Sequence, residues 1–428
     1  MQTASRDRQW NVRIVLAGRF AMSAARALTG VVTPIYLAVI GFSAVRLGVL
    51  FLTVAATSAV LATAVGAASD RVGGKPFLIV MPLLTAAAAV TFAVSDRTAA
   101  LFVAAALGSF GRGSGAGAGA VGPYQPAESA FAAEAVPAAE RNSLFGRLAF
   151  FASLGAFAGG LLALLARESH TVDPARAVAA FRPAFLAVAA LCTVAAAVAL
   201  GLAEPRDRHH GRKPQRGALL PRRSRRLLTR LWITNSLNGL AVGMFGPFLT
   251  YWFYRRYGVG AGEIGVLYAI VNVASLPSTL GAAGLAHRFG TVRTTASVRV
   301  VQSLLLVPMA LSPTFLLAGG VYVVRMAAQR IGLPLRQSYV VAMADPRERA
   351  RVTALSQVPA QATSAIAPVF AGYLFEHVSL TLPIELASLL QLSNAALFYA
   401  FFRHQRPEEE RGDLETTPGD PPDQPAIT

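Results

Sequence analysis

The fold of this chain is decided by the stretch Gly66-Ala-Ala-Ser-Asp70-Arg71-Val-Gly73-Gly74-Lys75. It separates two apolar runs, residues 46–68 and 77–95, and each run is long enough to cross about 30 Å of hydrocarbon as a helix. Its paired glycines allow a tight reversal between antiparallel helices. Its charged residues then lie at the level of the lipid headgroups, where water hydrates them. The stretch therefore predicts a helical hairpin that turns at a membrane surface.

Apolar runs of this kind recur along almost the whole chain. The 428 residues are 54% hydrophobic and only 14% charged, which is too apolar for a soluble domain. Backbone polar groups inside lipid must bond within their own segment, so each run is predicted to be helical. The sequence predicts an all-α membrane protein with twelve transmembrane helices, near residues 14–40, 46–68, 77–95, 98–122, 143–166, 181–203, 231–254, 262–286, 294–312, 314–343, 352–375 and 380–402.

The two halves of the sequence repeat each other at one constant offset. Gly41, Gly48, Val49, Leu50, Arg71 and Gly73 return as Gly258, Gly265, Val266, Leu267, Arg288 and Gly290. This repeat predicts two pseudo-symmetric six-helix bundles, residues 1–203 and 231–403, with a cavity at their interface. Residues 204–230 are predicted to form a basic linker, and residues 404–428 a disordered acidic tail.

Positive charge is concentrated in the linker. The net charge is +17, and the linker holds Arg206, Arg208, Arg212, Lys213, Arg216, Arg222, Arg223, Arg225, Arg226 and Arg230. Under the positive-inside rule, this distribution predicts a cytoplasmic linker and both termini on the cytoplasmic side of the inner membrane. No aromatic or groove-reading motif accompanies the charges, so nucleic acid is not an expected partner. The first apolar run carries Arg19 and Arg26 and is expected to be retained rather than cleaved.

The sequence holds no pattern that predicts a cofactor or an enzyme. The single Cys192 excludes an intrachain disulfide, and His209-His210 lacks further ligands for a metal. A Walker-type nucleotide motif is absent, so ATP hydrolysis within this chain is disfavoured. No nucleophile and base occur together with a metal or an oxyanion partner. We therefore expect neither metal nor cofactor.

The opening stretch resembles the signature loop of the major facilitator superfamily, Gly-x-x-x-Asp-Arg-x-Gly-Arg-Arg/Lys, with Gly74 in place of the first basic residue. The second half carries a degenerate copy, His287-Arg288-Phe-Gly290-Thr-Val-Arg293, in which His287 replaces the acid. The resemblance implies a cytoplasmic gate in which Asp70 caps the eleventh helix and Arg71 or Lys75 meets Glu134. The gate residues implied in this way are Gly66, Asp70, Arg71, Gly73, Lys75 and Glu134.

Charged and polar residues inside the apolar runs are the candidates for binding a solute. The resemblance implies that helices one, four, seven and ten line the cavity. Four arginines on these helices could bind an anionic group through the guanidinium fork: Arg26, Arg112, Arg325 and Arg330. Three amides, Asn235, Asn238 and Gln337, could supply hydrogen bonds. Snorkelling, structural pairing and helix packing are the alternatives for all of them.

Glu128 is the candidate for proton coupling. Burial favours its neutral form and a nearby arginine favours its ionised form, so solute and proton could compete for one charge. Glu134, by contrast, is expected to be structural.

The resemblance implies secondary active transport of a small molecule by alternating access, in a monomer surrounded by membrane lipid. We expect proton-coupled efflux of a small organic solute, possibly an anion, because Gly146, Gly155, Gly159 and Gly160 are spaced partly like an antiporter signature. The prolines of that signature are missing. Two alternatives stay open: proton-coupled uptake of a sugar or organic acid, and a receptor or scaffold that moves no solute.

Overall fold

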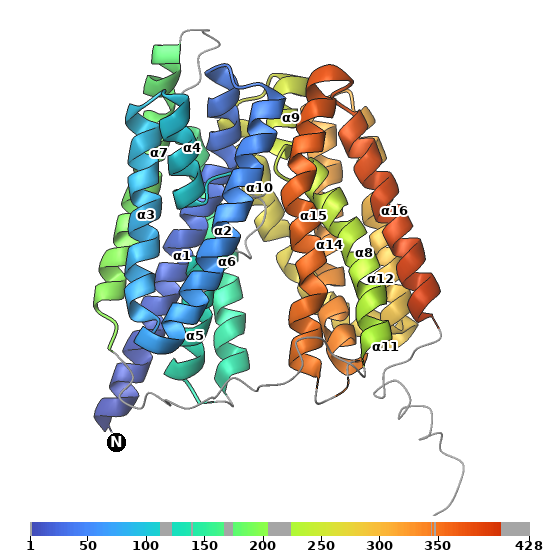
Figure 1. Ribbon diagram of the computed structural model, residues 1–428, viewed down its shortest axis with the longest axis horizontal. Helices are drawn as coiled ribbons and strands as arrows, with labels where there is room; N and C mark the ends of the chain where they lie inside the picture. Colours follow the sequence, from blue (N-terminus) through green and yellow to red (C-terminus); the bar gives the residue numbers. More distant parts are fainter. Residues whose placement is uncertain are drawn as a thin grey trace, which may run out of the picture.

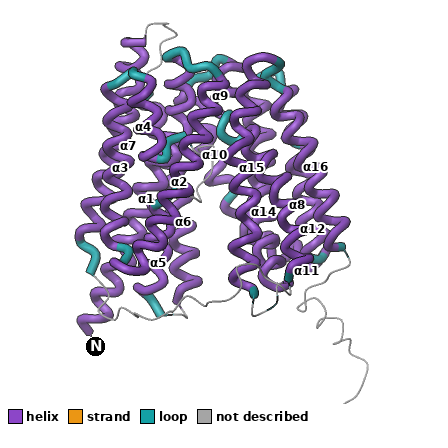
Figure 2. Tube along the Cα trace, in the orientation of Figure 1, coloured by secondary structure: helices purple, strands orange, loops and turns teal. Residues whose placement is uncertain are grey.

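The computed structural model describes residues 2–111, 122–137, 140–166, 174–203, 224–343, 345 and 348–403 (Figure 1). Within these ranges the chain forms α-helices and short 3₁₀ turns, with no strand (Figure 2). The all-α prediction is therefore confirmed. Arg112, the acidic tail and residues 204–223 of the linker lie outside the described ranges, so the predictions made for them are not tested.

Most helices overlap the predicted apolar runs, but the helix Tyr124–Ala135 lies between two of them. They are α1 (Gln2–Val39), α2 (Ala44–Val72), α3 (Lys75–Val94), α4 (Thr98–Gly108), α5 (Tyr124–Ala135), α6 (Arg141–Leu162), η2 (Ala163–Leu165), α7 (Pro174–Leu200), α8 (Arg225–Phe245), α9 (Leu249–Tyr257), α10 (Ala261–Ala274), α11 (Leu276–Phe289), α12 (Thr291–Leu304), α13 (Leu306–Leu311), α14 (Phe315–Met343), α15 (Arg349–His377) and α16 (Leu382–Phe402). Eight described helical segments are long and apolar enough to cross a membrane. The number of twelve spans stays a prediction.

Several predicted helices are interrupted in the structure. The run 98–122 is predicted as one helix, but α4 ends at Gly108. Residues 112–121 lie outside the described ranges, and the next described helix begins at Tyr124. The backbone leaves the helical region there, because Ser109 has a φ of 57° and Gly122 a φ of 62°. The second half is also broken between α8 and α9, between α10 and α11, and between α12 and α13. Apolar length predicts the span, but it does not locate these breaks.

The helices form two groups that meet at one end. In Figure 1, α1 to α7 lie on the left, and α8, α11, α12, α14, α15 and α16 lie on the right. Helices α9 and α10 lie between the upper ends of the two groups. The N-terminus lies at the lower end. We call the lower end the inner end and the opposite end the outer end.

Close backbone contacts seal the outer end. A Cβ on Gly48 of α2 would overlap the carbonyl oxygen of Pro368 on α15, and a Cβ on Gly372 would overlap that of Ala44. Gly160 of α6 and Gly265 of α10 approach each other in the same way. Small residues permit such contact between membrane helices, where close packing replaces the hydrophobic effect. The two halves are therefore joined backbone to backbone at this end.

Side chains reinforce the outer seal. Phe51 of α2 packs edge-on against Phe248 at 5.3 Å between ring centroids, and Phe248 lies 5.1 Å from Phe375 of α15. The hydroxyl of Thr250 on α9 donates a hydrogen bond to the carbonyl of Gly30 on α1 (3.2 Å). Thr250 is itself buried. The Phe51–Phe248 and Thr250–Gly30 contacts cross from one half to the other near the outer end, which leaves the molecule closed there.

Glu376 adds an ionisable contact to this seal. It lies just beyond the predicted span 352–375, and its Oε2 accepts a hydrogen bond from the backbone N–H of Val45 in the first turn of α2 (2.9 Å). This hydrogen bond lowers the pKa of the exposed Glu376 carboxyl below its ordinary value of 4.5. An anion at a helix N-terminus also interacts favourably with the helix dipole.

The effect of Glu376 on stability should depend on pH. Because its pKa is lowered in the sealed form, its contribution is complete above its ordinary pKa and is lost as the pH falls through the lowered value. We expect Glu376→Gln to lower the thermal midpoint of the purified protein at neutral pH, and this difference to shrink below about pH 4. Glu385→Gln, an exposed residue on α16, is the matched control. A pH-independent difference for Glu376→Gln would contradict the assignment.

The linker is anchored to one half at each of its ends. The amide of Asn11 exchanges two hydrogen bonds of 2.9 Å with the backbone of Ala203, and the indole of Trp10 donates to the carbonyl of Gly201. At the other end, Glu348 accepts a hydrogen bond from the backbone N–H of Ser224 (2.9 Å). The chain thus enters and leaves the linker from fixed positions at the inner end.

Replacing Asn11 should measure the strength of the first anchor. Asn11 is buried, so Asn11→Ala leaves two backbone groups of Ala203 without their partners. We expect a loss of about 1–3 kcal/mol in stability, measured as a lower midpoint of thermal unfolding in detergent. The neighbouring Gln9 is exposed, so Gln9→Ala should leave the midpoint nearly unchanged. Equal effects of the two changes would show that the Asn11 contacts contribute little.

Candidate functional site

A polar cavity of about 200 Å³ lies between the two halves. Its lining residues come from four helices, namely Arg19 of α1, Gln125, Glu128 and Ser129 of α5, Phe145, Leu148, Ala149, Ala152 and Ser153 of α6, and Arg330 of α14. The first three helices belong to the N-terminal half and α14 to the C-terminal half. Since both halves contribute to one cavity, relative movement of the halves would change its shape and its access.

An ion pair between Arg19 and Glu128 lines this cavity. Arg19 Nη1 lies 2.8 Å from Glu128 Oε2, and the two side chains are only 7% and 3% exposed. A carboxylate at this depth needs a basic partner, because an unpaired buried charge is costly. The other oxygen, Oε1, is buried and has no hydrogen-bond partner among the described residues. Glu128 therefore has one oxygen bound to Arg19 and one that could take up a proton.

The structure thus pairs the predicted coupling residue with an arginine that sequence analysis did not include among the binding candidates. Arg19 lies two helical turns before Arg26, on the same face of α1. The available clue was the need of Glu128 for a basic partner. However, the two residues are 109 positions apart in the sequence, so the pattern alone did not identify which arginine would serve.

Arg330 faces the ion pair from the C-terminal half. Its Nη2 donates a hydrogen bond to Asn272 Oδ1 on α10 (3.3 Å), and the amide of Asn272 donates to the carbonyl of Tyr268 (2.9 Å). Asn272 is buried. These contacts position the guanidinium, and no carboxylate is bound to it in the part of the chain that the structure describes. Of the three predicted arginines that the structure describes, Arg26, Arg325 and Arg330, only Arg330 lines this cavity.

Arg325 occupies a different environment. It is fully buried, with its guanidinium carbon 4.5 Å from the centre of the Phe245 ring. Its Nη1 lies 3.4 Å from Gln329 Oε1, and its Nε has no hydrogen-bond partner among the described atoms. Cation–π contact compensates part of its lost hydration. Arg325 does not line the cavity, so its role as a binding residue stays a prediction.

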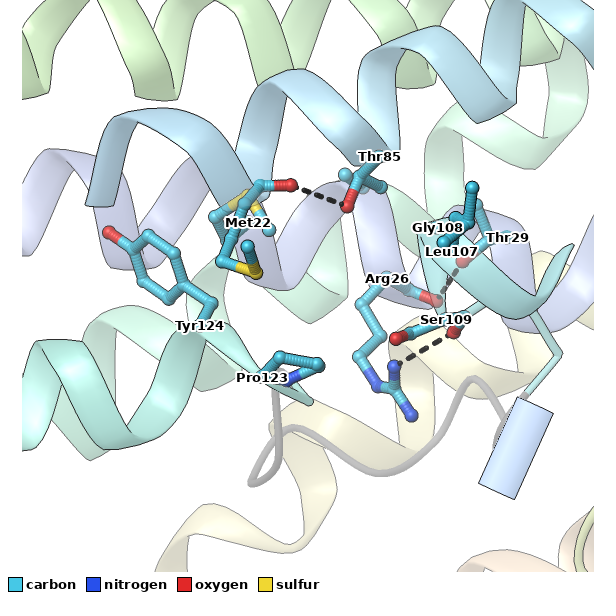
Figure 3. Close-up of a pocket in the computed structure, with 11 residues that line it drawn as sticks. Met22, Arg26, Thr29, Thr85, Leu107, Gly108, Ser109, Pro123 and Tyr124 are labelled. Carbon is cyan, nitrogen blue, oxygen red and sulfur yellow. Dashed lines mark hydrogen bonds between the residues drawn. The ribbon is translucent and has the colours of Figure 1, made fainter. Parts of the chain in front are cut away.

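Arg26 lines a second, smaller pocket, shown in Figure 3. Its Nη1 donates to the carbonyl of Ser109 (3.3 Å), at the point where α4 ends. Thr29, Thr85 and Tyr124 also line this pocket, whose volume of about 30 Å³ is enough for one water molecule. The structure therefore places Arg26 at the break after α4 and outside the larger cavity.

Of the three predicted amides, Asn235 and Asn238 lie away from the cavity, and the side chain of the third is not described. Asn235 is buried and donates to the carbonyl of Ser356 on α15 (2.6 Å). Asn238 accepts a hydrogen bond from Asn394 on α16 (3.5 Å). Both contacts join helices within the C-terminal half, as the packing alternative predicted. The side chain of Gln337 lies outside the described part of the chain.

The packing around Gly74 explains why this loop has glycine where the family pattern has a basic residue. A Cβ on Gly74 would lie 3.0 Å from the carbonyl oxygen of Ala127 and 3.2 Å from the Cβ of Phe131, so a large side chain would not fit against α5. Gly73 has a φ of 89°, which favours glycine. Lys75 donates to the carbonyl of Leu202 (2.7 Å), beside the linker anchor.

The predicted gate contacts are only partly accessible in this structure. Arg71 is exposed, and the side chains of Asp70 and Glu134 lie outside the described part of the chain. The contact found for Lys75 is to the backbone after α7 rather than to an acid. The gate implied by the resemblance, including the packing of Gly66 in α2, stays a prediction.

Comparison with known proteins gives one family and one fold. The family model described as Major Facilitator Superfamily matches residues 15–323 and 231–424. No curated protein matches the sequence. A bacterial homolog of the human lysosomal transporter Spinster, in an inward-facing and unoccupied conformation, has a TM-score of 0.69 at 13% identity, covering 93% of this chain and 97% of that one.

Two further solved structures show the same likeness. The nucleoside transporter NupG has a TM-score of 0.70 at 14% identity, covering 92% of this chain and 99% of its own. A D-xylose–proton symporter has a TM-score of 0.66 at 14% identity, covering 91% and 98%. At such low identity these structures establish the fold alone.

Proposed function

The chain belongs to the major facilitator superfamily and is a membrane transporter rather than an enzyme, and from this premise we propose that it moves a small organic solute by alternating access, with proton coupling at Glu128. The observation that carries the proposal is the buried Arg19–Glu128 ion pair in a cavity shared by the two halves. Transporters of this architecture bind their solute at the interface of two repeats, which rock about it.

The closed outer end supports a state in which the solute exchanges from the inner side. The contacts of Gly48, Gly160 and Thr250 join the halves near the outer end. Transport then requires these contacts to open and new contacts to form at the inner end. Figure 1 shows the two groups of helices meeting at the top, which agrees with this picture.

Glu128 is suited to proton coupling because its two carboxylate oxygens differ. Arg19 binds Oε2, and Oε1 has no described hydrogen-bond partner. Protonation would remove the negative charge and release Arg19. Solvent can reach this part of the cavity, since Gln125 beside it is exposed. A proton can therefore change the charge of the cavity without a large rearrangement.

Location, orientation and oligomeric state are parts of the same proposal. The two anchors of the basic linker lie at one end of the helices, and the positive-inside rule assigns that end to the cytoplasm. We therefore propose a multi-pass protein of the cytoplasmic membrane with both termini inside. The cavity is formed within one chain, which supports function as a monomer.

The spacing of glycines in α6 no longer favours export over import. Gly155 and Gly159 pack against the backbone of Phe20 and Ala24 on α1, and Gly160 packs against Gly265 on α10. Close helix packing explains all three glycines without reference to direction. Efflux, the direction expected from the sequence, therefore has to be judged from the chemistry of the cavity.

The proposal is tested by solute counterflow in proteoliposomes that contain the purified full chain. We expect a labelled solute to enter vesicles preloaded with the same unlabelled solute. The double variant Glu128→Ala/Arg19→Ala should abolish this exchange. Empty vesicles and the exposed-site variant Glu385→Gln are the controls. Binding without any exchange would instead favour a receptor or scaffold, and it would defeat the proposal.

A further inference from the structure

Buried positive charge exceeds buried negative charge among the residues that the structure describes. Three arginines, Arg19, Arg299 and Arg325, are buried among the residues that the structure describes, whereas Glu128 is the one buried carboxylate there. Arg299 binds Asn394 and packs over Phe398, so a neutral partner takes the place of an acid. Each buried guanidinium loses its hydration, and this loss favours association with an anion.

The same excess is present in the cavity. Among the described residues, its lining holds two guanidinium groups, Arg19 and Arg330, and one carboxylate, Glu128, and these three groups carry a net charge of +1 when Glu128 is ionised. In that form Arg19 is bound to Glu128, and Arg330 has Asn272 as its partner. The cavity therefore offers Arg330 to an anion while Glu128 is ionised, and protonation of Glu128 removes the negative charge that Arg19 binds.

Resting on the function proposed above, we infer that the solute is a small organic carboxylate that enters the cell together with a proton. A proton binds Glu128 and breaks its ion pair with Arg19. The acidic group of the solute then lies between Arg19 of one half and Arg330 of the other. A planar carboxylate suits two guanidinium forks, each of which can donate paired hydrogen bonds.

Bridging explains why the proton is required. A carboxylate bound to Arg330 alone contacts only one half of the protein. It therefore does not stabilise the form in which the other half closes over it. When Arg19 is released, the same carboxylate binds both halves and stabilises the form in which they approach. The cavity with proton and monoanion bound again carries a net charge of +1, like the empty ionised cavity. Loaded and empty forms therefore face a similar electrostatic cost on closure.

The direction of transport follows from this coupling. Proton and anion bind together rather than in competition, so both cross the membrane in the same direction. An inward proton gradient then drives uptake of the acid. In an antiporter the proton and the solute compete, so that binding of the proton displaces the solute. A cationic solute bound to Glu128 would be displaced in this way. The two arginines disfavour a cation.

The groups around Glu128 agree with this assignment. Arg19 on α1 and Arg330 on α14 are cationic, Tyr124 lies one turn before Glu128 on α5, and α6 presents the uncharged Ser153. Hydroxyl and amide groups of Ser129, Ser153 and Gln125 could bind hydroxyls of the solute. A volume of about 200 Å³ is smaller than the 300–1,000 Å³ of common ligand pockets, which selects a small molecule.

The test uses proteoliposomes loaded with a pH-sensitive dye and three classes of poorly permeant probe. The carboxylates are glycerate, gluconate and quinate, the uncharged compounds are erythritol, glucose and inositol, and the amine is glucosamine. We expect an inward gradient of at least one carboxylate to acidify the interior, and none of the uncharged or amino compounds to do so. Uptake measured with labelled probe should rise when the outside is made acidic.

Matched variants connect the result to the cavity. Arg330→Gln should raise the half-saturating concentration of the carboxylate by about tenfold or more, because a charge-assisted contact is lost. Arg336→Gln is the control, since Arg336 lies on the same helix and binds Gln357 outside the cavity. It should change that concentration less than about twofold.

The outcomes separate the inference from the function on which it rests. Movement of the sugars or the amine alone, or movement of a carboxylate without acidification, would overturn the inference and leave a transporter in place. Equal effects of Arg330→Gln and Arg336→Gln would also overturn it. If no probe of any class moves while the protein is folded by its thermal unfolding curve, the proposed function itself fails.

Discussion

Replacing Glu128 with Gln should leave solute exchange intact but abolish accumulation driven by a pH gradient. The amide cannot bind or release a proton near neutral pH, so the solute crosses the membrane without a proton. Its carbonyl oxygen can still accept a hydrogen bond from Arg19. A gradient of one pH unit supports about tenfold accumulation in a one-to-one symporter, and the variant should fall to equal concentrations on both sides.

Accumulation and counterflow have to be measured on the same preparations. The variant should show counterflow at a rate similar to that of the unchanged protein and no response to an imposed pH gradient. Glu385→Gln, which changes an exposed carboxylate on α16, should retain the full gradient response. If Glu128→Gln still accumulates solute in proportion to the pH gradient, Glu128 is not the coupling residue.

Replacing Gly48 with Leu should prevent the outer end from closing and stop transport. The Cβ of any larger residue would overlap the carbonyl oxygen of Pro368, which belongs to the backbone of α15 and cannot move independently. Forcing a side chain into a packed helix contact costs about 1–3 kcal/mol or more, enough to shift a balanced two-state equilibrium at least about fivefold. The form with an open outer end should then predominate.

The open outer end can be detected by labelling. Thr250 is buried in the seal, so Thr250→Cys should react slowly with a membrane-impermeant maleimide added from outside, and much faster when Gly48→Leu is present. The natural Cys192 is buried and should contribute little background. Val49→Leu introduces leucine at the exposed neighbouring position and serves as the control. Unchanged labelling with full transport activity in Gly48→Leu would refute a role for this contact in gating.

Much of the fold could be predicted because it depends on local properties of the sequence. Long apolar runs predict helices, and the stretch around Asp70 to Lys75 predicts a turn between two of them, as found between α2 and α3. The interruption after Phe245 contains Pro247, which has no backbone N–H to donate within a helix. The interruption after Gly108 could not be predicted from apolarity, and there Ser109 has a φ of 57°.

The candidate site was only partly predictable. Glu128 was identified because few carboxylates lie in or next to the apolar runs, and it lines the cavity. Its partner Arg19, the packing role of Asn235 and the separate pocket of Arg26 depend on which face of a helix meets which neighbour. A single sequence gives the depth of a residue in the membrane, but it does not give the helix that lies opposite.

The anchored ends of the linker have a mechanical consequence. Ala203 and Ser224 are each held by their own half, and the 21 residue steps between them can extend to about 70 Å at about 3.3–3.6 Å per step. Chain length alone therefore permits the two anchors to move apart by any amount up to that distance.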